Sequence, residues 1–316
     1  MTSEAPFVRP DVRAFLDMLE ALNRPDLGDM PIEEARASYL MMRDMADHPP
    51  AELAVVRDLT CPGPAGEISL RLYDARAERG PGPLVVFFHG GGFVIGDLES
   101  HHNICTQIAA ELDLPVVAVD YRLGPEHPFP AAPEDCEAAA RWLAEGPAEL
   151  GREVTGLIPM GDSAGGNLAI VTTQSLLLEP AAVPVVLQVP IYPVCDDRKK
   201  HPSYELFKEG YLLTTAAMDF FDRSYAADPG DRRVHPVHGP FEGMPPTVLV
   251  TAGLDPLRDS GRAFAADLVR AGCDVTYLEM PGITHGFVQI RKAVPSAQDD
   301  LLAVLSAAKT MLERIA

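Results

Sequence analysis

The sequence has no long uninterrupted run of apolar residues. A membrane-spanning helix needs about 18 such residues in a row, and no window of this chain approaches that. The first residues also lack the basic segment and apolar core that mark a secretory signal. We therefore expect a soluble, cytoplasmic protein with no stable membrane association.

Basic residues and paired cysteines are scarce as well. Lysine and arginine number 26 against 46 aspartates and glutamates, which leaves a formal net charge of −20. A surface of that sign repels nucleic acid, so no nucleic-acid partner is expected. The five cysteines are scattered and form no CxxC pair, which argues against a disulfide framework and against a cysteine-based metal site.

Histidine-based metal sites are not expected either. The chain has two close histidine pairs, His101 with His102 and His235 with His238. Neither pair has a further ligand at metal-binding spacing along the chain. We therefore predict that no metal ion binds at these histidines.

The chain does contain many short apolar runs, separated by stretches with helical spacing. Because these runs are continuous and do not alternate with polar residues, they indicate strands buried on both faces of a parallel sheet. They lie at residues 84–88, 115–119, 156–160, 183–189, 247–251 and 274–280. Upstream, residues 51–75 alternate around a Pro-Gly-Pro turn, which predicts an antiparallel hairpin. The fold class is therefore α/β, with an open, mostly parallel central sheet flanked by helices.

Two segments do not fit this alternation of strands and helices. Residues 10–46 carry two amphipathic helical patterns before the first strand. Residues 195–236 form a connection far longer than an α/β sheet needs, and long insertions in such folds are often functional. Both segments are expected to be helical additions to the sheet domain.

Two glycine-rich motifs follow predicted strands directly. His89 and the glycines at 90–92 follow the run at 84–88, and three glycines in a row suggest that backbone N–H groups approach another molecule closely. The second motif, GDSAGG at residues 161–166, lies between a strand and a helix. This order is typical of a nucleophile elbow, in which Ser163 stands clear of the sheet on a tight turn. Taken alone, GxSxG is also compatible with a glycine-rich turn that opens a helix.

A serine nucleophile needs a histidine base, and the base needs a carboxylate that orients it. On this type of sheet the chain order is serine, acid, histidine. His285 is the only histidine that follows the candidate acid Asp255. Asp259 is a second candidate acid, but Asp255 precedes a proline and belongs to the loop, whereas Asp259 is expected inside the next helix.

Several motifs in the same order resemble the bacterial hormone-sensitive-lipase-like (family IV) esterases of the α/β-hydrolase fold. They are HGGGFVIGDLESH, VVAVDYRLGPEHPFPAAPED, GDSAGGNLA, DPLRDSG and HGF, and the resemblance covers residues 53–290. It implies a carboxylic ester hydrolase that works through an acyl-serine intermediate without a metal or an organic cofactor. In this family pattern Ser163 is the nucleophile, Asp255 the acid and His285 the base.

The resemblance also assigns an oxyanion hole to the two glycine motifs. Its donors are the N–H groups of Gly91, Gly92 and Ala164, with Gly90 as a weaker candidate. His89 precedes the serine, so we expect it to hold the glycine loop by a hydrogen bond and not to act as a base.

The resemblance further divides the chain into a sheet core and a helical cap. It predicts cap helices in 1–50 and a cap insertion in 195–236, with the core in 51–194 and 237–316. Five cap aromatics could either line an acyl pocket or pack between helices: Tyr204, Phe207, Tyr211, Phe220 and Phe221. Members of the family usually prefer short- to medium-chain acyl esters, and many form homodimers through the sheet edge near the C-terminus.

Proteins with other functions carry the same catalytic triad or a similar fold. An amidase or an acyltransferase shares the triad and the tetrahedral intermediate, so the triad alone does not exclude either. Plant gibberellin receptors resemble this family but have lost the catalytic histidine. The presence of His285 argues against such a non-catalytic receptor.

Overall fold

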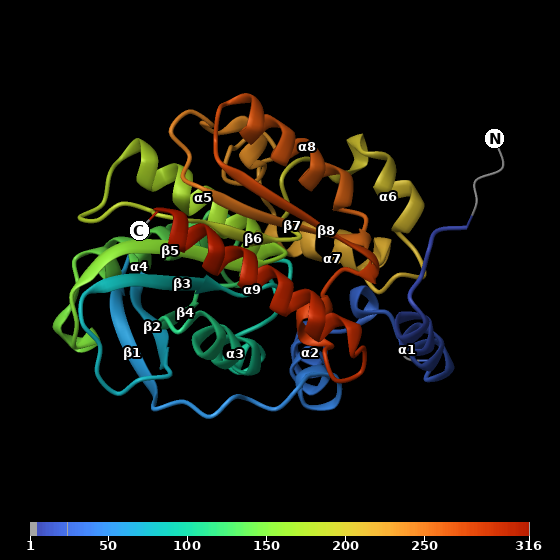
Figure 1. Ribbon diagram of the computed structural model, residues 1–316. Coiled ribbons are helices and arrows are strands. Elements are labelled where there is room, and N and C mark those ends of the chain that lie inside the picture. Colours follow the sequence, from blue (N-terminus) through green and yellow to red (C-terminus); the bar gives the residue numbers. More distant parts are fainter. Residues whose placement is uncertain (1–4, 24, 316) are drawn as a thin grey trace.

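The computed structural model describes residues 5–23 and 25–315, which build one eight-stranded sheet between two layers of helices (Figure 1). The strands are β1 (Val55–Gly63), β2 (Gly66–Asp74), β3 (Gly82–Phe88), β4 (Val116–Asp120), β5 (Val154–Asp162), β6 (Val189–Ile191), β7 (Thr247–Leu254) and β8 (Val275–Thr284). Their order is β1-β2-β4-β3-β5-β6-β7-β8, and every strand except β2 runs in the same direction. The expected open, mostly parallel sheet is confirmed.

Helices cover both faces of the sheet and gather at one end of it. The α-helices are α1 (Pro10–Ala21), α2 (Ile32–Ala46), α3 (His102–Leu112), α4 (Ala131–Ala144), α5 (Ala164–Leu178), α6 (Pro202–Phe207), α7 (Thr215–Tyr225), α8 (Arg258–Arg270) and α9 (Ser296–Ile315). Helices α3 and α9 pack on one face, and α4, α5 and α8 pack on the other.

Strand β3 shows why its sequence is continuously apolar. Val85 and Phe87 point into the core beneath α3 and α9, whereas Val86 and Phe88 point into the core beneath α4 and α5. All four side chains are fully buried. Since successive side chains of a strand alternate between faces, only a strand covered on both sides needs an apolar residue at every position.

Most predicted strands are found within a few residues of their expected bounds, but the strand expected at 183–189 is wrong. In the structure β6 covers only Val189–Ile191. Residues 184–188 instead form isolated bridges, Leu157 with Val185 and Gln188 with Thr247. Pro184 has no N–H to donate, and the segment passes from beside β5 to beside β7 without forming a regular ladder. The hairpin predicted around Pro64 is confirmed as β1 and β2, with Gly63 opposite Gly66.

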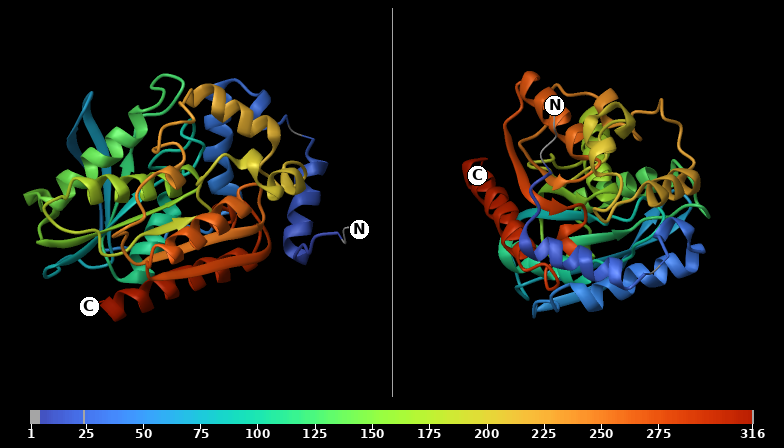
Figure 2. Two further views of the ribbon diagram at one scale, coloured as in Figure 1. Left: turned by 90° about the horizontal axis from the view of Figure 1, so that it is seen from above. Right: turned by 90° about the vertical axis from the view of Figure 1, so that its right-hand side faces the viewer.

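The N-terminal helices meet the long insertion at one end of the molecule, near the right-hand side of Figure 1. In the left view of Figure 2 the blue N-terminal helices lie at the same end of the molecule as the yellow helices of the insertion. The short 3-10 helix η1 (Leu27–Asp29) packs on α7, and Thr214 Oγ1 donates to Asp26 Oδ2 at 2.6 Å. We call residues 10–46 and 195–236 the cap segments.

Buried charge pairing ties the cap segments to the core. Arg291 is fully buried, and its guanidinium binds Asp47 through two hydrogen bonds, Nε to Oδ1 at 2.7 Å and Nη2 to Oδ2 at 2.8 Å. Asp47 directly follows α2, so this pair fixes the end of that helix against the segment before α9. Among the described helices, none is long and apolar enough to cross a membrane.

Candidate active site

Ser163 lies on the sharp turn between β5 and α5. Its backbone has φ 56° and ψ −117°, a strained conformation for a residue with a side chain. The Ser163 N–H donates to the carbonyl of Ile191 at 2.9 Å, which holds the turn against β6. Helix α5 begins at the next residue, so its positive N-terminal end lies at the serine.

The turn fits because the residues two positions before and after Ser163 are glycines, Gly161 and Gly165. A Cβ atom placed on Gly165 would lie 1.9 Å from the carbonyl oxygen of Phe88. This contact would push α5 away from β3. The glycine of the GxSxG motif is therefore explained by the close approach of helix and strand, as the nucleophile elbow requires.

His285 and Asp255 come from the ends of neighbouring strands and meet beside the serine. His285 Nε2 lies 2.8 Å from Ser163 Oγ, and His285 Nδ1 lies 2.7 Å from Asp255 Oδ2. Asp255 is fully buried, and its other oxygen accepts the N–H of Leu257 at 2.8 Å. The ring of Tyr192 packs against the imidazole with centroids 4.6 Å apart. The three side chains are thus aligned before any substrate binds.

Asp259, the alternative acid, is engaged elsewhere. It lies in the first turn of α8, where Oδ1 accepts from Arg258 and Oδ2 accepts the N–H of Ser203. Its pKa lies below the ordinary value, because these partners outweigh the effect of partial burial. Asp259 therefore connects the cap insertion to α8, and the structure brings Asp255 to the histidine instead.

The glycine loop after β3 presents free N–H groups beside Ser163. Gly91 and Gly92 have positive φ values of 115° and 61°. Among the described residues, no hydrogen-bond acceptor meets the N–H groups of Gly91, Gly92 or Ala164. The weaker candidate Gly90 differs, since its N–H already donates to Asp162 Oδ1 at 2.9 Å. We therefore leave Gly90 out of the oxyanion donors.

Asp162, the residue before the nucleophile, joins the two glycine motifs. It is only 2% exposed and accepts the Gly90 N–H, while His101 Nε2 lies 3.1 Å from the same Oδ1. Burial disfavours its charge, but His101 and the Gly90 N–H outweigh burial and hold the pKa of Asp162 below its ordinary value. A buried carboxylate thus fixes the glycine loop relative to the nucleophile turn.

The same buried contacts continue toward the cap. Gln289 lies four residues after His285, and its Nε2 is 2.9 Å from His101 Nε2. Tyr39 of α2 donates its hydroxyl to Gln289 Oε1 at 2.5 Å. His101 is therefore occupied within this network, and α2 is joined through it to the glycine loop.

His89 holds the glycine loop from the other side. Its Nδ1 lies 2.7 Å from the carbonyl oxygen of Gly90, and its ring stacks on Tyr121 with centroids 4.2 Å apart. The Tyr121 hydroxyl donates to the His89 carbonyl at 2.6 Å. Burial, together with the nearby His101, lowers the pKa of His89 to about 4. The expected supporting role of His89 agrees with these contacts.

Two cavities meet at Ser163. The larger, about 840 Å³, lies among α1, η1, α2 and residues 210–217, and it also borders His285. The smaller, about 340 Å³, lies among residues of the cap insertion and is richer in charge. Its ionisable side chains are Asp196, Asp197, Arg198, Lys199, Asp222 and His235. Of the five cap aromatics considered above, only Phe221 borders either cavity within the described chain.

Some of these residues could not be identified from motifs. Asp162 occupies the variable position of GxSxG, and the one signal in the sequence was an acidic residue directly after an apolar strand. His101 and Gln289 carry no spacing relation to Ser163 in the sequence. Their role depends on the order of the strands, which the sequence does not state directly.

The similarities to known proteins extend across the described site. A family profile described as the α/β hydrolase fold matches residues 85–289. Carboxylic ester hydrolase LipN of Mycobacterium tuberculosis is 38% identical over 270 residues, covering 82% of this chain and 71% of LipN. Ethyl acetate hydrolase of Pseudomonas putida is 33% identical over 315 residues, covering 95% of this chain and 98% of that protein.

A solved structure has nearly the same chain path. An ester hydrolase from the metagenome of Lake Arreo, complexed with a derivative of bipyridine phosphonate, superposes with a TM-score of 0.91 at 36% identity. The superposition covers 97% of this chain and 99% of the other. The likeness therefore spans the sheet and the cap segments together.

Proposed function

Since the chain belongs to the hormone-sensitive-lipase-like carboxylesterases of the α/β-hydrolase fold, we propose that it cleaves short- to medium-chain acyl esters through Ser163, His285 and Asp255. Its relatives are carboxylic ester hydrolases, and the chain is an enzyme that acts on small-molecule esters. The observation that carries the catalytic assignment is the continuous pair of hydrogen bonds from Ser163 through His285 to Asp255.

In the proposed acylation step, Ser163 Oγ attacks the ester carbonyl carbon while its proton passes to His285 Nε2. Asp255 accepts a hydrogen bond from His285 Nδ1–H, which fixes the tautomer and stabilises the imidazolium. The carbonyl oxygen becomes an oxyanion that the N–H groups of Gly91, Gly92 and Ala164 stabilise, each donor being worth ~2.7–4 kcal/mol of the barrier. When the intermediate collapses, the bond from the carbonyl carbon to the alkoxy oxygen breaks, and the imidazolium of His285 donates its Nε2 proton to that oxygen, so that the alcohol leaves.

In the second step, water hydrolyses the acyl-serine. His285 accepts a proton from the water, the oxygen attacks the acyl carbon, and the same donors stabilise the second oxyanion. The carboxylic acid then leaves and Ser163 regains its proton. No residue outside the triad and the oxyanion loop is needed for proton transfer in this scheme.

The position of the base, His285, indicates which cavity takes the alcohol part of the ester and which takes the acyl part. The leaving alcohol must lie next to His285 Nε2 to receive its proton, and His285 borders only the larger cavity in the described part of the chain. The alcohol therefore occupies the larger cavity and the acyl group occupies the smaller one. A volume of about 340 Å³ favours short and medium acyl chains.

Three further expectations stay proposals. We propose that the enzyme works in the cytoplasm. From the net charge of −20 we further propose that it has no nucleic-acid partner. We propose that two copies form a homodimer through the outer edge of β8 at the end of the sheet, where, among the described residues, Arg9 occupies only the carbonyls of Pro281 and Gly282.

The proposal is tested with p-nitrophenyl esters from acetyl to palmitoyl, using the wild type and Ser163→Ala. We expect the wild type to hydrolyse the short esters, with kcat/KM falling as the chain outgrows the smaller cavity, and the variant to be inactive. A folded wild type that hydrolyses no ester would overturn the proposal. Turnover of matching p-nitroanilides in that case would instead identify an amidase.

A further inference from the structure

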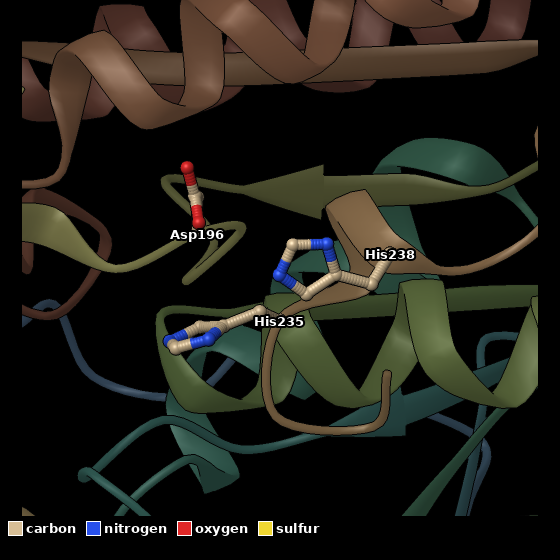
Figure 3. A group of neighbouring side chains, drawn as sticks. All are labelled: Asp196, His235 and His238. Carbon is tan, nitrogen blue, oxygen red and sulfur yellow. The ribbon is translucent and has the colours of Figure 1, made fainter. Parts of the chain in front are cut away.

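Three potential metal ligands converge beside the smaller cavity: Asp196, His235 and His238 (Figure 3). Each offers one ligand atom, and these atoms all lie within 4.8 Å of one another. Asp196 follows β6, whereas His235 lies at the end of the cap insertion and His238 just beyond it, in the 3-10 helix η4 (Pro236–His238). The prediction of no metal site considered spacing along the chain, and spacing could not reveal Asp196, which is distant in sequence.

Neighbouring groups already orient two of these ligands. His235 Nδ1 lies 3.1 Å from the carbonyl oxygen of Pro229, to which it can donate a proton. That hydrogen bond leaves Nε2 as the ring nitrogen with a free electron pair, the arrangement usual for metal-bound histidine. Asp196 Oδ1 accepts the N–H of Asp197 at 2.7 Å, and His201 Nε2 lies 3.2 Å from Oδ2.

Besides His201, one permanently charged group competes with a metal ion for Asp196. Lys200 Nζ lies 3.0 Å from Asp196 Oδ1, but its side chain is 53% exposed. An exposed ion pair of this kind contributes only ~0–1 kcal/mol, so a divalent cation can displace it. The lysine can then turn into solvent without leaving a buried charge unpaired.

We propose that Asp196, His235 and His238 form a site for a borderline divalent transition metal such as Zn²⁺. Two imidazoles and one carboxylate are ligands that zinc binds in proteins, with water able to take the fourth position. Zinc bonds of ~2.0–2.2 Å separate tetrahedral ligand atoms by roughly 3.4 Å, so ligand atoms up to 4.8 Å apart must close by at most about 1.4 Å. His238 is exposed and free to make most of that movement.

If the proposed function is correct, a metal ion bound at this site affects ester hydrolysis. Asp196 and His235 line the smaller cavity, and Ser163 lines the same cavity. A bound ion with its water therefore reduces the space available to the acyl group. Zinc is expected to inhibit the longer acyl esters more strongly than the acetyl ester.

The binding test uses protein first stripped with EDTA and then titrated with zinc chloride by calorimetry. We expect one equivalent to bind the wild type, with affinity weakened ~10-fold or more in His235→Gln and in His238→Ala because each loses one ligand. His127→Ala is the matched control, since His127 is an exposed histidine outside the cluster. Cobalt(II) absorption provides a second readout, because its bands report coordination geometry.

The outcomes separate the site from the esterase assignment, since calorimetry does not depend on turnover. Unchanged affinity in both cluster variants, or no binding by the wild type, would overturn the metal site even if ester hydrolysis is confirmed. Circular dichroism of each variant shows whether weak binding reflects loss of fold. Saturating zinc that leaves the hexanoyl-to-acetyl ratio of kcat/KM unchanged would overturn the proposed effect on the cavity.

Discussion

The hydrogen bonds that join Ser163, His285 and Asp255 make these side chains act as one unit. Removing either Ser163 or His285 disables the same proton transfer, so Ser163→Ala and His285→Ala should each lower kcat by several powers of ten, up to ~10⁶. The double variant should be little worse than either single variant. Steady-state kinetics on p-nitrophenyl acetate checks this, with melting curves to show that each variant folds. Nearly additive losses would contradict the triad assignment.

His89 makes stability depend on pH. It is 2% exposed, and its pKa of about 4 in the folded protein lies below the value of ~6.5 in an unfolded chain. Between these two values the unfolded chain binds a proton that the folded protein does not, so acidification favours unfolding. The stability linked to neutral His89 is therefore complete above pH 6.5 and falls as the pH drops to about 4. The loss is on the order of 3 kcal/mol.

Denaturant unfolding of the wild type and His89→Asn at pH 7 and pH 4 measures this loss. Asparagine does not titrate, so the stability advantage of the wild type over the variant should shrink at the lower pH. An advantage that stays constant between the two pH values would show that His89 is not the group responsible. Other acidic groups titrate in both proteins and largely cancel in the comparison.

Helix α7 of the cap depends on a missing side chain in the glycine loop. A Cβ atom on Gly92 would lie 2.2 Å from Phe221 Cγ, and Gly92 also has a φ of 61°. Gly92→Ala should therefore push α7 outward or displace the Gly92 N–H, and lower kcat/KM by at least the ~10²-fold loss of one oxyanion donor. Adding Phe221→Ala should restore part of the activity, because it removes the atoms that clash.

The control for this prediction is Gly151→Ala. Gly151 has a similar φ of 67°, yet a Cβ there would meet no atom within 4 Å. It should lose ~1–3 kcal/mol of stability through backbone strain alone and retain its activity. If Phe221→Ala gives no recovery in the Gly92→Ala background, the clash with α7 is not the cause of the loss.

Helices and strands whose form depends on neighbouring residues could be predicted from the sequence. Features that depend on contacts between distant segments could not. Strand β3 was predicted because burial on both faces makes every residue apolar. The strand at 183–189 was misplaced because an apolar run does not show whether its backbone groups pair regularly with a neighbouring strand. Around Pro184 only isolated bridges form. Ser163 was predicted from a motif between a strand and a helix, and His285 because it is the only histidine after Asp255. Asp162 was not singled out, since its role comes from a contact with Gly90 in another strand's loop.

The arrangement of the complete chain was less accessible to sequence reasoning. Residues 10–46 could be predicted as helices, but their contact with the insertion near Thr214 joins segments almost 200 residues apart. The resemblance to the hormone-sensitive-lipase-like esterases implied a cap of this kind, whereas residue patterns alone indicated only extra helices. The size and charge of the two cavities arise from this long-range packing, so neither could be derived from spacing.

The proposed division of the substrate between two cavities predicts separable effects of filling each one. Val234 lines the smaller cavity and Leu19 lines the larger one. Val234→Phe should lower kcat/KM for hexanoyl esters more than for acetyl esters of the same alcohol. Leu19→Trp should instead lower kcat/KM for acetyl esters of bulky alcohols more than for acetyl esters of small alcohols. The measurement is a grid of acyl and alcohol sizes for the wild type and both variants. If Val234→Phe responds to the alcohol and Leu19→Trp to the acyl chain, the two cavities have been assigned the wrong way round, because the proton from His285 would then be delivered from the other side of the ester.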